Sequence, residues 1–233
     1  MQNKPRLFCF TYAGGSAAFF DVIERDLEGL EVRKLEYTGH GERHKEPFYE
    51  NFDELADDMF GIIKNELFVD YALFGYSMGS ISAVEVLKRI LSSDVPTPKH
   101  VFLAAHEPHT KSELLGFTAE EMDEWVKERT IRFGDVPEKL MNNRVFWRTY
   151  LPIYRTDYSI IGNYQFEALD LQTDIPATVF YSDTDTPFAD MKQWQRFFTG
   201  PVSFHCFEGN HFFIRSHHAE MAEIIKTELG ARI

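Results

Sequence analysis

The most constraining feature of this sequence is a glycine-flanked motif, Gly75-Tyr76-Ser77-Met78-Gly79. An apolar run at 71–74 precedes it, and apolar residues at helical spacing follow it from 81 to 91. The pattern is G-x-S-x-G, in which a serine occupies a sharp turn between a buried strand and a helix. Glycine at 75 and 79 removes side chains that would crowd such a turn. The motif therefore predicts a nucleophilic Ser77 at a helix N-terminus, where developing negative charge is stabilised.

Strand-like and helix-like segments alternate along most of the chain. Apolar strand-like runs occur at 6–12, 32–37, 71–74, 101–105, 178–181 and 202–207, with helical patterns at 52–67, 81–91 and 219–229. This rhythm predicts a mostly parallel central sheet with helices on both faces. Residues 107–167 instead hold helical segments at 118–133 and 137–150 and no clear strand. We expect one α/β-hydrolase domain over 1–233, with 107–167 as a helical lid over the strand ends.

A serine nucleophile needs a histidine base that an acid orients, and in this fold the order along the chain is serine, acid, histidine. Five of the nine histidines precede any plausible late acid, and those at 205, 217 and 218 lie in a strand or at the start of the last helix. His211 follows a strand in a loop, so we expect it to be the base. The strand at 178–181 runs into Asp183 and Asp185, and spacing alone does not choose between these acids.

Acyl chemistry also needs backbone N–H groups that stabilise an oxyanion, one directly after the nucleophile and one from a loop after an early strand. Met78 supplies the first. The turn Tyr12-Ala13-Gly14-Gly15 is the expected source of the second, because small residues let the backbone approach the reacting carbonyl. We expect no metal and no cofactor, since His106 and His109 flank a proline and have no apparent third ligand.

Charge and cysteine content narrow the environment and the partners. The net charge of -13 argues against nucleic acid, and no apolar stretch approaches the roughly 20 residues of a membrane helix. Two cysteines, Cys9 and Cys206, and no convincing signal peptide favour a cytoplasmic protein, which we expect to be monomeric. Between 127 and 155, seven basic residues stand against three acidic ones. This segment forms either a surface that steers an acidic partner or an ordinary solvated helix face.

Taken together, these motifs resemble the type II thioesterases that accompany nonribosomal peptide and polyketide synthetases. Residues 10–16 (FTYAGGS) resemble that family's oxyanion segment, residues 39–43 its Pro-Gly-x-Gly-x-Arg turn, and residues 151–158 (LPIYRTDY) a signature of its lid. Tyr76 stands where the family commonly has histidine. The resemblance implies that Asp185 is the acid, because Ser182 takes the place of the family's glycine three residues before it. It also implies that the N–H of Ala13 serves the oxyanion hole.

The resemblance further implies an activity and a partner. The activity is hydrolysis of acyl thioesters on the phosphopantetheine arm of an acyl or peptidyl carrier protein, through an acyl-enzyme on Ser77. The enzyme would act in trans on misloaded or stalled acyl groups, and its basic segment would face the acidic helices of the carrier. Two alternatives stay open: a small-molecule carboxylesterase with the same triad, and a non-catalytic binding protein of the hydrolase fold.

Overall fold

The central sheet places the loop that follows strand 6–10 beside the loop that follows strand 71–76. The computed structural model describes residues 4–110, 116–134 and 136–230. Its six strands pair in parallel in the order β2-β1-β3-β4-β5-β6, so the predicted sheet is confirmed. The order in which strands are added reverses here, because β2 lies on one side of β1 and β3 on the other. Ligands of open parallel sheets bind at such switch points. The strands are β1 (Arg6–Phe10), β2 (Glu31–Leu35), β3 (Tyr71–Tyr76), β4 (His100–Ala104), β5 (Ala177–Tyr181) and β6 (Val202–Cys206).

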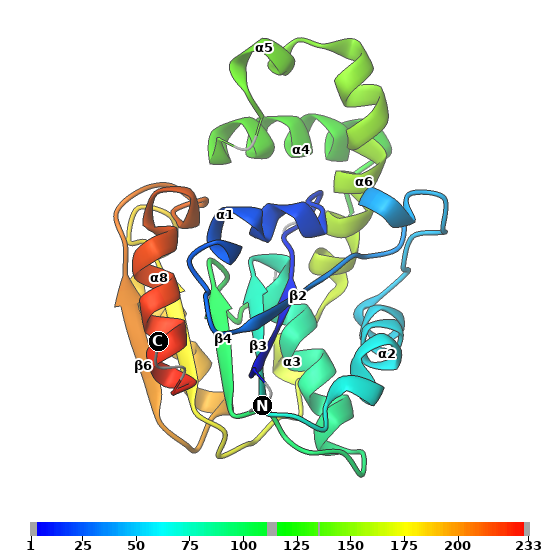
Figure 1. Cartoon of the computed structure of the whole chain (residues 1–233). Helices are drawn as coiled ribbons and strands as arrows, with labels where there is room; N and C mark the ends of the chain where they lie inside the picture. Colours follow the sequence, from blue (N-terminus) through cyan, green and yellow to red (C-terminus); the bar gives the residue numbers. More distant parts are fainter. Residues whose placement is uncertain (1–3, 111–115, 135, 231–233) are drawn as a thin grey trace.

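Helices cover both faces of the sheet, as the sequence predicts (Figure 1). Helices α2 (Phe52–Ile63) and α3 (Met78–Leu91) lie on one face, and α1 (Asp21–Glu24) and α8 (Ile214–Glu228) on the other. Strand β3 serves both layers, because Leu73 packs in the cluster with α2 and α3 while Phe74 packs with α8. All six residues of β3 are buried, as expected for a strand covered on both sides.

Short elements complete the layers. They are the short helix α7 (Phe188–Met191) and the 3₁₀ turns η1 (Ala17–Phe20), η2 (Gly41–Arg43), η3 (Lys64–Glu66), η5 (Phe166–Ala168) and η6 (Lys192–Phe197). Helix α8 begins five residues before the expected start at 219 and is kinked at His217. Within the described ranges, no helix has the length and apolarity needed to cross a membrane.

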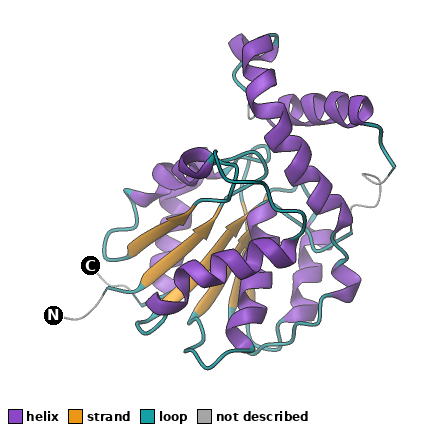
Figure 2. Ribbon diagram, turned by 90° about the vertical axis from the view of Figure 1, so that its right-hand side faces the viewer, coloured by secondary structure: helices purple, strands orange, loops and turns teal. Residues whose placement is uncertain are grey.

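Between β4 and β5 most of the described chain is helical, and its helices project beyond the carboxyl ends of the strands (Figures 1 and 2). It forms α4 (Ala119–Phe133), α5 (Glu138–Met141) and α6 (Arg144–Asn163), which we call the α4–α6 segment. Residues 111–115 and 135 of the expected 107–167 insertion lie outside the described residues. Thr118 and Glu121 form a capping box that starts α4, and Gly134 ends it at φ 76°.

The expected helix at 137–150 is a short helix followed by a much longer one. Asn143 accepts hydrogen bonds from the N–H groups of Val145 and Phe146, which starts α6 anew. Helix α6 is 20 residues long and continues past Pro152. Its later turns bury residues such as Tyr158 and Ile161, and this packing outweighs the hydrogen bond that the proline removes.

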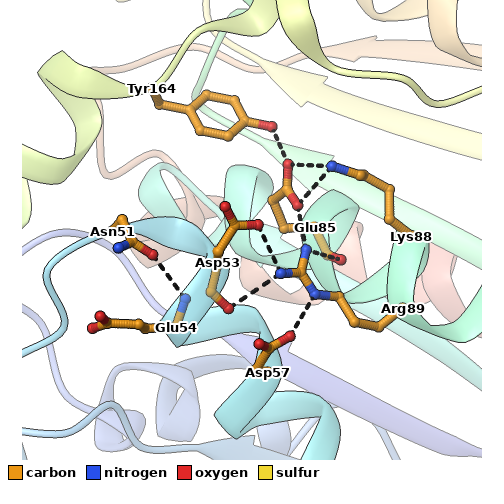
Figure 3. A network of polar contacts seen from close by, with 8 residues as sticks. All are labelled: Asn51, Asp53, Glu54, Asp57, Glu85, Lys88, Arg89 and Tyr164. Atoms are coloured by element: carbon orange, nitrogen blue, oxygen red, sulfur yellow. Dashed lines mark hydrogen bonds and ion pairs between the residues drawn. The ribbon is translucent and has the colours of Figure 1, made fainter.

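A buried carboxylate ties the end of α6 to the core. Glu85 of α3 is 3% exposed and accepts a hydrogen bond of 2.6 Å from the hydroxyl of Tyr164, directly after α6 (Figure 3). It also pairs with Arg89 at 2.6 Å, and Arg89 reaches Asp53 and Asp57 of α2 at 2.8 and 2.9 Å. Because a buried charge needs such partners, this network fixes α2, α3 and the end of α6 together.

Replacing Tyr164 by phenylalanine tests this anchor. The change removes one hydrogen bond to a buried charge, so we expect Tyr164→Phe to lower the free energy of unfolding by about 1.5–3 kcal/mol in urea titrations. Tyr150→Phe is the matched control, because Tyr150 of α6 is 41% exposed and its loss of a hydroxyl should leave stability unchanged. Equal stability of both variants and the parent protein would contradict the anchor.

Candidate active site

The predicted nucleophile lies in a backbone bend that only the motif's glycines allow. Ser77 has φ 54° and ψ −120°, directly between β3 and α3, a conformation that is uncommon and strained for a residue with a side chain. A Cβ on Gly79 would lie 1.9 Å from the carbonyl oxygen of Phe10, and one on Gly75 would lie 2.2 Å from the carbonyl oxygen of Gly79. The bend brings β1, β3 and the start of α3 into backbone contact and leaves the Ser77 side chain at the ends of the strands.

The structure brings Ser77, His211 and Asp185 together in one hydrogen-bonded chain. Nε2 of His211 lies 2.9 Å from Oγ of Ser77, and Nδ1 lies 2.8 Å from Oδ2 of Asp185. All three side chains are almost fully buried. Because the carboxylate accepts from Nδ1, that nitrogen carries the proton and Nε2 is free to accept the proton of the serine hydroxyl. This is the arrangement of a serine nucleophile with its general base.

The geometry separates the two candidate acids. Both follow β5, but only Asp185 reaches the imidazole. Oδ1 of Asp183 accepts a hydrogen bond of 3.1 Å from the N–H of Phe188, at the start of α7. Asp183 is therefore engaged at the start of α7, and Asp185, which the resemblance implies as the acid, is the aspartate that contacts His211.

Several residues that the sequence analysis did not assign hold the histidine in place. The hydroxyl of Tyr76 donates a hydrogen bond of 2.8 Å to the carbonyl of His211. Oγ of Ser182 donates one of 2.6 Å to the carbonyl of Gly209, which links the acid loop to the histidine loop. Phe133, the last residue of α4, stacks on the imidazole at 4.2 Å with an interplanar angle of 11°. The α4–α6 segment thus contacts the imidazole of His211 directly.

The predicted oxyanion donors flank the serine. Met78 is the first residue of α3, so its N–H lies at the helix N-terminus next to Ser77. Ala13 follows β1 and lines, together with Ser77 and His211, the same narrow space. The neighbouring N–H of Gly14 is engaged elsewhere, since it donates to Oδ2 of Asp157 at 2.6 Å. Within this turn, Ala13 thus borders the serine while Gly14 is tied to the carboxylate of α6.

A buried ion pair fixes that turn to helix α6. Nε2 of His40 lies 2.9 Å from Oδ2 of Asp157, and Nδ1 lies 2.9 Å from the carbonyl of Thr38. His40 and Asp157 are 2% and 3% exposed. A neutral imidazole has one N–H, so two acceptors require both nitrogens to be protonated. Burial opposes this charge, but the carboxylate of Asp157 outweighs it and raises the pKa of His40 above its usual value.

His40 and Asp157 were visible in the sequence only as parts of family motifs. The order rule set His40 aside as a base, and nothing in the spacing joined it to Asp157.

Among the described residues, no group of three or more histidine, cysteine or acidic side chains is placed to hold a metal ion. Nδ1 of His106 donates a hydrogen bond of 2.6 Å to the carbonyl of Glu107.

Replacing Asp157 by asparagine tests the ion pair. The change leaves a buried charge on His40 without a counter-ion, so we expect the free energy of unfolding to fall by about 3–5 kcal/mol near pH 6. The raised pKa of His40 means that the pair stabilises the protein fully below about pH 6.5 and loses its effect as the pH rises through the folded-state pKa. The difference between parent and variant should therefore narrow in urea titrations near pH 9.

Asp123→Asn is the matched control. Asp123 pairs with Arg155 at the surface, at 2.5 Å, and an arginine does not titrate in this range. We expect that variant to lower the free energy of unfolding by about 1 kcal/mol or less at either pH. If the loss of unfolding free energy in Asp157→Asn did not change with pH, a charged His40 would be ruled out.

Comparison with known proteins agrees with this geometry. A family model described as a thioesterase domain matches residues 5–229. The medium-chain S-acyl fatty acid synthase thioesterase of Rattus norvegicus is 28% identical over 219 residues, covering 90% of this chain and 81% of its own. The gramicidin S biosynthesis protein GrsT of Aneurinibacillus migulanus is 25% identical over 230 residues, covering 97% and 89%. The structure of the type II thioesterase BorB from the borrelidin biosynthetic cluster has a TM-score of 0.85 at 25% identity, covering 98% and 94%. The chain belongs to the thioesterase domain family.

Proposed function

We propose that this thioesterase hydrolyses acyl groups from the phosphopantetheine arm of carrier proteins, and that it clears misloaded or stalled acyl chains from nonribosomal peptide or polyketide synthetases. The observation that carries the proposal is the hydrogen-bonded chain from Ser77 through His211 to Asp185, in a chain that matches the thioesterase family from 5 to 229. Relatives named for gramicidin S biosynthesis and for the borrelidin cluster support the biosynthetic context.

The positions of the side chains support a two-step mechanism. Oγ of Ser77 attacks the thioester carbonyl while Nε2 of His211 takes its proton, and Asp185 stabilises the resulting imidazolium. The N–H groups of Met78 and Ala13 stabilise the negative oxygen of the tetrahedral intermediate. The intermediate collapses to an acyl-serine as His211 donates the proton to the leaving thiol. A water molecule then attacks the acyl-serine with His211 again as base, which releases the acid and restores the serine.

The α4–α6 segment is proposed as a lid that meets the carrier. Two of the seven basic residues between 127 and 155 are engaged within it, because Arg155 pairs with Asp123 and Arg129 lies over aromatic rings. Exposed bases remain on its surface, with the exposed apolar side chain of Val145 among them. Such a surface suits the acidic helices of a carrier protein on an otherwise acidic enzyme. These exposed bases are Arg132, Lys139, Arg144 and Arg148.

The remaining expectations complete the proposal. The enzyme acts in the cytoplasm as a monomer and needs no metal or cofactor of its own. Its cysteines support a reducing compartment, because Cys9 is buried and Cys206 exposed, and both are free thiols. Burial raises the pKa of the Cys9 thiol, so it stays protonated and inert.

Acyl release from loaded carrier proteins tests the proposal. We expect acetyl-loaded and long-acyl-loaded carriers to be hydrolysed with higher kcat/KM than the matching N-acetylcysteamine thioesters. Ser77→Ala should lower kcat on the order of 10⁴-fold or more and abolish labelling by a fluorophosphonate probe. Equal rates for carrier-bound and free thioesters, with fast turnover of simple oxygen esters, would favour the carboxylesterase alternative. Absent labelling of the parent protein would favour a non-catalytic one.

The two aspartates after β5 offer an internally matched test of the acid. Asp185→Asn should lower kcat by about 10⁴-fold, because the amide no longer holds His211 in the required tautomer. Asp183→Asn should leave kcat unchanged, since an amide oxygen still accepts from the N–H of Phe188. Steady-state kinetics on one acyl-carrier substrate compares kcat of the two variants with that of the parent. The opposite order of the two effects would show that Asp185 is not the acid.

A further inference from the structure

A cavity of about 190 Å³ opens beside the serine, under helix α4. Ser77 and His211 form one end of it, and Trp125, Phe133 and Tyr158 contribute aromatic walls from the α4–α6 segment. Because the attacked carbonyl must lie next to Oγ of Ser77, this cavity is placed to receive part of the acyl group. These aromatic rings suit a hydrocarbon chain. Charged side chains also line the cavity, and the guanidinium of Arg129 lies against the rings themselves.

Arg129 lines this cavity without a polar partner. It forms no hydrogen bond or ion pair with any residue that the structure describes, and its Nε is buried and unsatisfied. Its guanidinium carbon lies 4.4 Å from the ring centre of Phe133, 5.0 Å from that of Trp125 and 5.8 Å from that of Tyr158. Stacking of this kind uses the faces of the guanidinium group and leaves the N–H donors at its edge. A buried donor without an acceptor is costly and calls for an explanation.

The other charged groups around the cavity do not supply the missing acceptor. Asp185 is engaged with His211, and Glu107 lines the cavity but forms no ion pair with Arg129. Arg132, one turn of α4 further on, adds a second positive charge to the same wall. The cavity therefore presents a planar cation, held in place by aromatic rings, that matches a planar anion such as a carboxylate.

The position of Arg129 shows which part of the substrate carries that anion. The ring of Phe133 contacts both the guanidinium, at 4.4 Å, and the imidazole of His211, at 4.2 Å, so Arg129 lies one ring away from the base. The phosphate of a phosphopantetheine arm is at the far end of the arm from the thioester and does not reach this point when the carbonyl is at Ser77. The acceptor must belong to the acyl group itself.

We propose that Arg129 is a specificity residue that binds a carboxylate on the acyl group, so that the enzyme prefers carboxyacyl thioesters to apolar ones of the same shape. This inference rests on the proposed function and names a substrate class for it. The carboxylate takes the edge donors of Arg129, including Nε, while Phe133 and Trp125 keep the guanidinium plane in position. The aromatic walls then enclose the carbon chain between the carboxylate and the thioester.

Isosteric thioesters of N-acetylcysteamine test the proposal without a carrier protein. Malonyl and isovaleryl groups have the same arrangement of non-hydrogen atoms, as do glutaryl and 5-methylhexanoyl groups. The readout is the ratio of kcat/KM within each pair, compared between parent and variant, because differences in intrinsic reactivity then cancel. We expect Arg129→Met to lower the ratio at least about tenfold in one pair or both, mainly through KM of the carboxyacyl substrate. Arg129→Lys keeps the positive charge but loses the forked N–H donors of the guanidinium group. Its ratio should lie between those of the parent and of Arg129→Met.

Lys64→Met is the matched control, since it removes one positive charge from an exposed position outside the cavity and should leave both ratios unchanged. Thermal unfolding of each variant checks that it folds; if Arg129→Met does not, Arg129→Lys decides by the same ratio. Unchanged ratios in both pairs, with isovaleryl and 5-methylhexanoyl thioesters still hydrolysed, would overturn the role of Arg129 and leave the thioesterase intact. Failure to hydrolyse any thioester, free or carrier-bound, would overturn the proposed function and this inference with it.

Discussion

The site depends on one backbone contact, the approach of Gly79 to the carbonyl of Phe10. No side chain fits there, since a Cβ would lie 1.9 Å from that oxygen. The contact presses the start of α3 against the end of β1 and forces the left-handed bend at Ser77. It therefore places the serine beside the turn that follows β1, where Ala13 lies, and within reach of the loops after β5 and β6. The strain at Ser77 is sustained because the surrounding sheet and helix are buried on every side.

The α4–α6 segment contacts two parts of the proposed active site, through two different kinds of contact. Asp157 of α6 holds the N–H of Gly14 and the imidazolium of His40, so moving α6 away would leave a charge buried without its partner. Phe133 of α4 holds His211 by ring stacking, worth about 1 kcal/mol. The imidazole of His211 is thus contacted by a ring of α4, and the turn after β1 by a charged group of α6. Tyr164 adds to the attachment of α6, because it ties the end of that helix to Glu85.

The sequence predicts those parts of the site that depend on local patterns of neighbouring residues. The bend at Ser77, the parallel sheet and the loop position of His211 each follow from a few neighbouring residues, and the structure has them where they were expected. The choice of Asp185 over Asp183 needed the family resemblance, because both side chains follow the same strand and only their directions differ. Helix α6 was misjudged in length, since the packing of Tyr158 and Ile161 overrides Pro152.

Other features depend on contacts between distant segments and had no local signal. His40 was rejected as a base by chain order, yet its partner Asp157 gives it a structural role. Arg129 was counted with its neighbours as part of a basic surface, although a helix directs successive residues to different sides. The structure turns Arg129 toward the rings beside Ser77 and leaves other bases, such as Arg148, outside. Charge counted along a sequence does not distinguish a solvated face from a lined cavity.

Trapping the covalent intermediate tests directly whether Ser77 is the nucleophile. Acid-quenched reactions with an acyl-loaded carrier protein, digested and analysed by mass spectrometry within the first turnover, locate the transferred acyl group. We expect a mass increase equal to the acyl group on the peptide that contains Ser77, appearing before the free acid accumulates. Turnover with an unmodified Ser77 peptide, or with the acyl group on another residue such as Cys206, would contradict it.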